Sequence, residues 1–183
     1  MLGLLASFSA AAAEPQTLCE ADLAHQAFLL KYRESQFSVS EVSRVVVVQA
    51  ENSLLLVQRN CNVIDEETYK TKALENHALL LEMLEAEFRV GSIAREEVNA
   101  AAIAALDLKW QMIAISTLEY CQQKFAVLVQ NRQIARGRFA AGSAARSALL
   151  EAELGIQKHR EFCSLEGSIE LPPVVDENEF PIP

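Results

Sequence analysis

The hydrophobic and polar positions of this chain follow helical spacing through most of its length. Residues 66–87 consist of strong helix formers without proline or glycine, and Asp65 stands directly before them as a candidate N-cap. Residues 93–112 are rich in alanine, with isoleucine, valine and leucine at the spacing of one helical face. The pattern predicts a series of helices at about 17–36, 41–61, 66–88, 93–113, 117–138 and 143–163.

The chain around three phenylalanines is repeated at a spacing of 51 residues. Each of them, Phe37, Phe88 and Phe139, precedes a serine or glycine by three residues and an arginine by seven. The arginines are Arg44, Arg95 and Arg146. A fixed period of this length is the signature of a repeated supersecondary unit. We therefore predict an all-α fold of three tandem antiparallel helical hairpins, packed as a bundle or short stack, with repeats at about 19–69, 70–120 and 121–171.

Each hairpin is predicted to bend at its Phe-x-x-Gly/Ser segment. A glycine there can take the left-handed conformation that ends a helix, and the serine after it can cap the next helix. These pairs are Gly91 with Ser92 and Gly142 with Ser143. In the first repeat Ser40 replaces glycine, and residues 38–41 offer a capping box instead. Residues 45–48, four valines, favour a strand in isolation, but the repeat places them in the second helix.

The repeated aromatic and basic residues have structural interpretations at this stage. Each phenylalanine is expected to pack against the partner helix and fix the hairpin angle, in preference to a ligand role. Each repeated arginine is expected either to bond carbonyl groups at the neighbouring helix end or to face water.

Four cysteines follow the same period. Cys19 and Cys61 hold the positions in the first repeat that Cys121 and Cys163 hold in the third. Each pair is equidistant from its hairpin turn, so antiparallel helices bring the two residues to the same height. Helix axes about 8–10 Å apart can place such Cα atoms within the ~4.4–6.8 Å of a disulfide. We predict the disulfides Cys19–Cys61 and Cys121–Cys163. An even cysteine count is typical of exported proteins with paired cysteines and agrees with this prediction.

A metal site is the alternative interpretation of the cysteines. His159 and Cys163 are four residues apart on one helical face, which makes them its candidate ligands. Neither C-x-x-C nor H-x-x-x-H spacing occurs in the sequence. Disulfides are therefore preferred, and no metal or other cofactor is predicted.

Composition and charge narrow the class of protein. The chain is 51% hydrophobic and 22% charged, with six glycines and five prolines, which is typical of one globular domain with a sizeable core. The formal net charge is −9, and residues 164–183 contain five acidic residues and no basic residue. Because no basic patch is present, nucleic acid and anionic membrane surfaces are poor partners.

The two ends of the chain differ from the helical domain, which is assigned to residues 14–165. Residues 1–13 are apolar and then small, and residues 11–13 fit a signal-peptide cleavage site, although the usual positive charges are missing. The alternative is a hydrophobic first turn of the first helix. No segment is long and apolar enough to span a bilayer, so we expect a periplasmic or secreted protein. Residues 166–183 form an acidic, proline-containing tail, either a disordered end or a second docking peptide.

Catalytic motifs are scarce. The P-loop, dinucleotide-binding, serine-hydrolase and zincin patterns do not occur. The nearest match to the Glu-x-x-His pattern of ferritin-like di-iron sites is Asp22 with His25. The single tryptophan, Trp110, is interpreted as a core anchor. The protein is therefore not expected to be an enzyme.

The second repeat resembles the periplasmic hairpin tip of TolC-type outer-membrane efflux proteins over residues 88–106, and the third is similar over residues 139–154. That family's pattern is an aromatic residue, two residues, glycine, a small polar residue and then a helix with regularly spaced alanines. In the family these tips meet the helical hairpin of a periplasmic adaptor. The resemblance implies a set of contact positions, Val90, Gly91, Ser92, Gly142 and Ser143. The β-barrel strands of the family are absent from this sequence.

Together these features predict a non-enzymatic interaction protein that presents hairpin tips to a protein partner in the cell envelope, such as an efflux or secretion assembly. One alternative is a periplasmic metal or stress sensor, which would need His25, His159 and the cysteines to converge at one end. Another is a carrier of a small molecule or lipid, which would need an apolar cavity between hairpins. The oligomeric state is left open.

Overall fold

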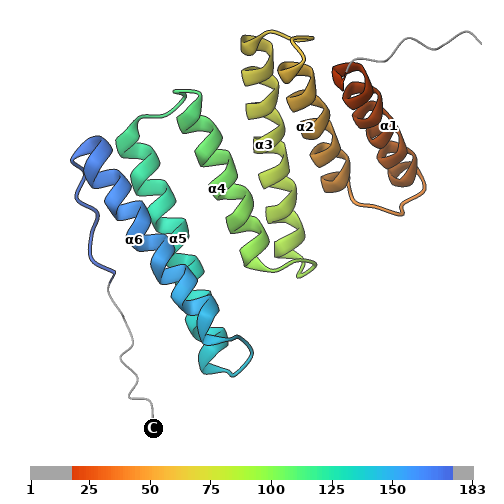
Figure 1. Ribbon diagram of the computed structural model, residues 1–183. Coiled ribbons are helices and arrows are strands. Elements are labelled where there is room, and N and C mark those ends of the chain that lie inside the picture. Colours follow the sequence, from red (N-terminus) through yellow and green to blue (C-terminus); the bar gives the residue numbers. More distant parts are fainter. Residues whose placement is uncertain (1–17, 175–183) are drawn as a thin grey trace, which may run out of the picture. The chain divides into compact units, whose positions relative to one another are not determined.

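A computed structural model describes residues 18–174, which form six α-helices and no β-strand (Figure 1). The predicted all-α fold is therefore confirmed. The helices are α1 (Leu18–Ser38), α2 (Arg44–Asn60), α3 (Glu66–Arg89), α4 (Arg95–Gln111), α5 (Thr117–Ala140) and α6 (Arg146–Gly167). The expected signal peptide, residues 1–13, lies outside the described residues.

The chain divides into two compact units at the boundary between the first and second repeats. The first unit, residues 1–69, contains the hairpin of α1 and α2, whose helices pack against each other. The second unit, residues 70–183, contains most of α3 and all of α4, α5 and α6. Within it α4 packs on α5, and α5 packs on α6.

All five connections between these helices use one turn geometry. One residue in each takes a left-handed conformation, with φ between 55° and 78°. These residues are Ser40, Asn62, Gly91, Ile113 and Gly142. The N–H of each donates to the carbonyl three residues earlier, and the next N–H donates to the carbonyl five residues earlier. This is the Schellman ending of a helix, so the left-handed role predicted for Gly91 and Gly142 is confirmed.

We call the turns around Ser40, Gly91 and Gly142 the tip turns, and those around Asn62 and Ile113 the base turns. In every turn the next helix follows an N-cap position three residues after the left-handed residue. At the base turns the caps are polar: the Asp65 carboxylate accepts from the Thr68 N–H at 2.6 Å, and the Ser116 hydroxyl accepts from the Glu119 N–H at 3.2 Å. The predicted N-cap role of Asp65 is confirmed.

The predicted caps at the tip turns are wrong. The N-cap positions there are Ser43, Ala94 and Ala145, so the second helix of each hairpin begins later than expected. Ser40 takes the left-handed position itself, and the Ser38 hydroxyl donates to the Ser35 carbonyl at 2.7 Å, inside α1. The Ser143 hydroxyl likewise donates back to the Arg138 carbonyl at 3.0 Å. A Schellman turn puts these serines at the end of the first helix, too early to cap the second.

The core of the second unit surrounds one disulfide. Its buried residues come from three helices and from the segment after α6, and they are Leu106, Tyr120, Cys121, Phe125, Ile156, Cys163 and Leu171. Trp110 packs against this cluster, as expected of a core anchor. Burying one such large apolar side chain contributes about 1.5–3 kcal/mol. This cluster therefore holds α4, α5 and α6 together.

In the first unit the buried side chains come from α2. Val45, Val47, Val48 and Leu55 are buried, whereas α1 contains no buried residue. The valine run is helical, so the repeat register correctly overrides the local strand preference. The face of α1 opposite the hairpin partner carries exposed apolar residues, including Phe28 at 65% and Tyr32 at 49% exposure.

The first part of the predicted tail packs on the third hairpin. Residues 168–174 follow α6 without regular structure, and Leu171 is buried in the core of the second unit. The Arg160 guanidinium donates to the carbonyl oxygens of Leu171, at 3.4 Å, and Pro172. Residues 175–183 lie outside the described part of the chain.

Candidate functional site

The tip turns carry exposed apolar side chains at one repeated position. Val39 and Val90 directly precede the left-handed residues of their turns and are 65% and 78% exposed. Ala141 holds this position in the third turn. The residues Phe37 and Phe139 are themselves 42% and 39% exposed, so the partner helix covers them only in part. Each tip therefore presents a small apolar surface.

The repeated arginines of the first two tip turns contact the repeated phenylalanines. The Arg44 guanidinium carbon lies 5.8 Å from the Phe37 ring centroid, and that of Arg95 lies 3.8 Å from the Phe88 centroid. Both geometries are cation–π contacts. The sequence led us to expect that each repeated arginine either bonds carbonyl groups or faces water. Neither expectation describes these contacts with the phenylalanine rings.

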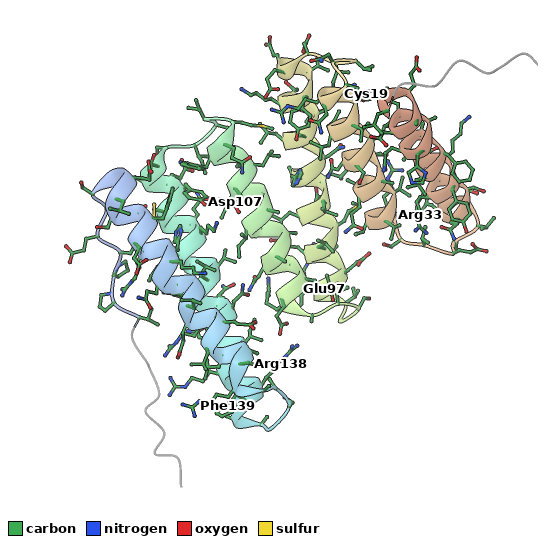
Figure 2. All side chains as sticks on the ribbon, in the orientation of Figure 1. Cys19, Arg33, Glu97, Asp107, Arg138 and Phe139 are labelled. Carbon is green, nitrogen blue, oxygen red and sulfur yellow. A yellow bond between two sulfur atoms is a disulfide. The ribbon has the colours of Figure 1, made fainter. Side chains whose placement is uncertain are left out.

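An ion pair links the second and third tip turns within the second unit. Arg138, next to Phe139, contacts Glu96 near the start of α4, with nitrogen and oxygen 2.7 Å apart. Figure 2 shows Arg138 and Phe139 at the tip of the third hairpin, away from Asp107. In the second unit both tip turns lie at the end opposite the base turn around Ile113 (Figure 1). One partner could therefore contact both tips.

Both predicted disulfides are present at the opposite ends of their hairpins from the tip turns. The Cα atoms of Cys19 and Cys61 are 5.7 Å apart, and those of Cys121 and Cys163 are 5.9 Å apart. The second pair is fully buried, whereas the first is partly exposed. Two disulfides fit a protein of an oxidising, non-cytoplasmic compartment.

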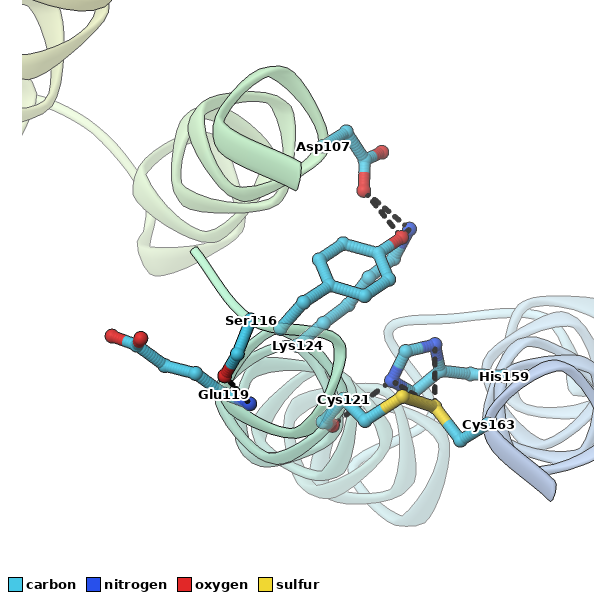
Figure 3. The surroundings of a disulfide bond; sticks show 8 residues. Asp107, Ser116, Glu119, Cys121, Lys124, His159 and Cys163 are labelled. Atoms are coloured by element: carbon cyan, nitrogen blue, oxygen red, sulfur yellow. Dashed lines mark hydrogen bonds and ion pairs between the residues drawn. A yellow bond between two sulfur atoms is a disulfide. The ribbon is translucent and has the colours of Figure 1, made fainter. Parts of the chain in front are cut away.

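A polar cluster lies beside the Cys121–Cys163 disulfide (Figure 3). The Lys124 ammonium donates to the Asp107 carboxylate at 2.7 Å and to the Tyr120 hydroxyl at 2.9 Å, and that hydroxyl donates to the same carboxylate at 2.8 Å. Burial acts to lower the pKa of Lys124, but the hydrogen bonds to Asp107 and Tyr120 outweigh it and raise this pKa. Burial raises the pKa of Tyr120. Lys124 is therefore a fixed cation neutralised by Asp107.

His159 is buried against the disulfide itself. Its Nε2 lies 3.0 Å from the Cys121 carbonyl oxygen and 3.5 Å from the Cys163 sulfur. Because a carbonyl only accepts, Nε2 carries a proton and donates to it. Burial lowers the pKa of His159, and the hydrogen bond to the Cys121 carbonyl offsets this only in part. The rings of Tyr120 and Phe162 complete its surroundings, with centroids 5.7 and 6.3 Å away.

The first hairpin lacks this cluster although it has the same disulfide. The positions equivalent to Tyr120, Lys124, His159 and Phe162 are Leu18, Asp22, Val57 and Asn60. The hairpin geometry therefore does not require the cluster, which is particular to the third repeat. Comparing the repeats position by position, 102 residues apart, is the sequence signal that could have revealed it.

Cys121, His159 and Cys163 are the residues of this region that could bind a metal ion. One ligand atom from each of Cys121, His159 and Cys163 lies within 4.8 Å of the others. The two sulfur atoms are bonded to each other, so the oxidised protein offers no thiolate there. The sequence candidates His159 and Cys163 are thus brought together, but as a disulfide and its neighbour. His25 lies on the exposed surface of α1, in the other unit.

Within residues 18–174, none of the helices combines the length and the apolar character needed to cross a membrane. Comparison with known proteins identifies no relative: no family model, no curated protein and no solved structure matches the chain.

Proposed function

We propose that this protein is a non-enzymatic helical interaction protein, periplasmic or secreted, that binds a protein partner in the cell envelope through its tip turns. The observation that carries the proposal is the exposed apolar residue at the same position of two tips, Val39 and Val90. The two disulfides support an oxidising compartment.

The chemistry of the tips suits binding to protein. Exposed apolar side chains beside half-covered aromatic rings are typical of recognition surfaces, whose affinity comes from a few apolar anchors. The Schellman backbone fixes each tip, so little conformational entropy is lost on binding. In the second unit the Arg138–Glu96 ion pair holds two tips at one end, which favours a partner large enough to contact both.

An efflux or secretion assembly remains the proposed kind of partner. The contact positions implied by the resemblance to TolC-type hairpin tips, Val90, Gly91, Ser92, Gly142 and Ser143, are all exposed. These positions are therefore accessible to a protein partner.

The test is photo-crosslinking in the native envelope with a photoreactive amino acid at position 90. Position 63 is the matched control, because Val63 is also an exposed valine, 56% exposed, but lies in a base turn. We expect a defined adduct from position 90 that is lost when Val39 and Phe139 are both replaced by aspartate. Equal adducts from positions 90 and 63, or none from position 90, would contradict tip binding.

A metal or stress sensor is the second candidate, because Cys121, His159 and Cys163 converge. In this role a dithiol reductant would supply two electrons and two protons, opening the disulfide to two thiols beside the imidazole. Zinc titration of the reduced protein, with His159→Val as the matched variant, tests the idea. Equal zinc binding by both proteins would count against a site at His159.

A carrier of a small molecule or lipid is less well supported. The hollow between α3 and α4, about 240 Å³, is lined by Leu74, Ala78 and Leu81 but also by charged residues. A hollow of about 650 Å³ beside the segment after α6 is open and lined in part by Arg160 and Glu170. Native mass spectrometry of protein purified without detergent would reveal a bound lipid if this function were correct.

A further inference from the structure

The interface between α4 and α5 shows how one hairpin of this repeat packs on the next. Four side-chain pairs run along it: Glu96 with Arg138, Asn99 with Asn131, Asp107 with Lys124, and Trp110 with Tyr120. The Asn99 amide donates to the Asn131 carbonyl oxygen at 2.8 Å, and Asn99 is buried. The first unit repeats one of these relations, since Arg59 lies over Tyr69 at 4.8 Å, 51 residues before Trp110 and Tyr120.

The first and last helices, α1 and α6, each have a face equivalent to one side of the α4–α5 interface, but no neighbouring hairpin of the described chain packs on it. The positions of α6 that match the α4 side of the interface are Ser147, Leu150, Lys158 and Glu161, 51 residues later. The positions of α1 that match the α5 side are Leu18, Asp22, Leu29 and Gln36, 102 residues earlier. All eight positions are the equivalents of residues in direct contact across the α4–α5 interface, and each is polar, charged or leucine. We call these sets the α6 end face and the α1 end face.

Both end faces expose apolar side chains. Leu150 and its neighbour one turn on, Leu154, are 52% and 47% exposed on α6. On α1, Leu18 is 79% exposed and Leu29 is partly buried. Helical-repeat proteins normally need end repeats with a polar outer face to stay separate. End faces with exposed leucines in the register of an internal interface indicate that something covers them.

Two of the four pairs complement each other when the end faces are set in the register of the α4–α5 interface. The Asp107–Lys124 ion pair becomes Lys158 on the α6 side and Asp22 on the α1 side, with opposite charges exchanged between the helices. The Asn99–Asn131 pair becomes Leu150 and Leu29, which is apolar on both sides.

The remaining two pairs are less specific. The Glu96–Arg138 pair becomes Ser147 and Gln36, which are both polar. The Trp110–Tyr120 pair becomes Glu161 and Leu18, which do not complement each other.

We propose that the α6 end face of one copy of this chain packs against the α1 end face of a second copy, and that the internal repeat interface thereby continues from chain to chain. The two faces differ, so the contact is heterologous and each copy can bind two others. The Asp22–Lys158 pair sets the register of this contact, and Leu29 with Leu150 supplies its apolar centre.

Charge exchange tests the proposal on the full chain with both disulfides intact. Sedimentation velocity over a concentration series at low salt should show association of the unaltered protein. Asp22→Lys alone and Lys158→Asp alone should each weaken association about tenfold, because an ion pair is replaced by a like-charge pair. Glu34→Lys is the matched control, because Glu34 is an exposed acidic residue of α1 outside the end face, and it should leave association unchanged.

Mixing separates the head-to-tail contact from other arrangements. An equimolar mixture of the two single variants should regain association, because each contact between a D22K copy and a K158D copy joins opposite charges. The double variant D22K/K158D should also regain association, because every contact between its identical copies again joins opposite charges. A protein that stays monomeric at all concentrations would overturn the proposal. So would a symmetric α1–α1 dimer, which D22K would affect and K158D would not.

Discussion

The base turn at Ile113 gives the sharpest test of the turn geometry. Ile113 has φ of 56°, a left-handed conformation that costs an L-amino acid about 1–2 kcal/mol, and β-branching places it among the least tolerant residues. The matching residue 51 positions earlier is Asn62, at φ of 55°. Asparagine tolerates this conformation far better. The repeat itself therefore suggests the substitution Ile113→Asn.

The expected change in the free energy of unfolding follows from the exposure of Ile113 and the strain of its backbone. Ile113 is 89% exposed, so removing it loses only a few tenths of the roughly 1.5–3 kcal/mol that full burial of isoleucine contributes. Relief of about 1–2 kcal/mol of backbone strain outweighs this loss. We expect Ile113→Asn to raise the free energy of unfolding by about 1 kcal/mol, close to a fivefold change in the unfolding equilibrium constant.

Urea unfolding followed by the fluorescence of Trp110, three residues before Ile113, reports on this turn directly. Ala114→Gly is the control, because Ala114 is the next residue but is not left-handed, and the glycine should destabilise by about 0.4–1 kcal/mol because it adds conformational entropy to the unfolded chain. The reciprocal change Asn62→Ile should cost about 1 kcal/mol by far-UV circular dichroism. A variant Ile113→Asn that is no more stable than the unaltered protein would refute the assigned turn.

Three further predictions concern the third hairpin and its contact with α4. Replacing Cys121 and Cys163 with serine should lower the free energy of unfolding by about 4 kcal/mol, because the disulfide closes a separation of 42 residues, and calorimetry of oxidised and variant protein checks this. Burial lowers the pKa of His159 in the folded state, so the unfolded chain takes up the proton first as the pH falls. Stability should therefore decrease from pH 7.5 to 5.5, and urea titrations of His159→Val, the residue found at position 57, should show a flatter profile. Asp107→Asn should destabilise by about 1–2 kcal/mol because the half-buried Lys124 loses its charged partner; Glu66→Gln, which breaks the exposed ion pair with Arg59, should have a smaller effect.

Periodicity predicted the helices and cysteine pairing, because both depend on spacing alone. The 51-residue repeat correctly placed residues 45–48 in a helix against their β-branched preference, and equal distances from the turns identified both disulfides. The start of α2 was missed because a capping box at residues 38–41 and a Schellman turn at Ser40 compete for the same residues. Sequence does not show that competition, since serine suits a cap better than a left-handed position.

The contacts of side chains were harder to predict than the helices. The repeated arginines lie over phenylalanine rings in two turns, a geometry set by the compact Schellman backbone. The cluster of Asp107, Lys124 and His159 joins three helices, and neither motif spacing nor helical pattern connects such distant positions. Comparison of equivalent repeat positions would have shown that the third hairpin differs from the first.

Disulfide mapping of protein isolated from its native compartment most directly tests the central claim, which is that repeated hairpins are closed by disulfides in an oxidising compartment. Peptide mass spectrometry with free thiols blocked at lysis should recover Cys19 linked to Cys61 and Cys121 linked to Cys163, with both bonds fully formed. Free thiols at these positions would contradict an oxidising compartment. Links between Cys19 and Cys163, or between Cys61 and Cys121, would contradict the register of the repeat.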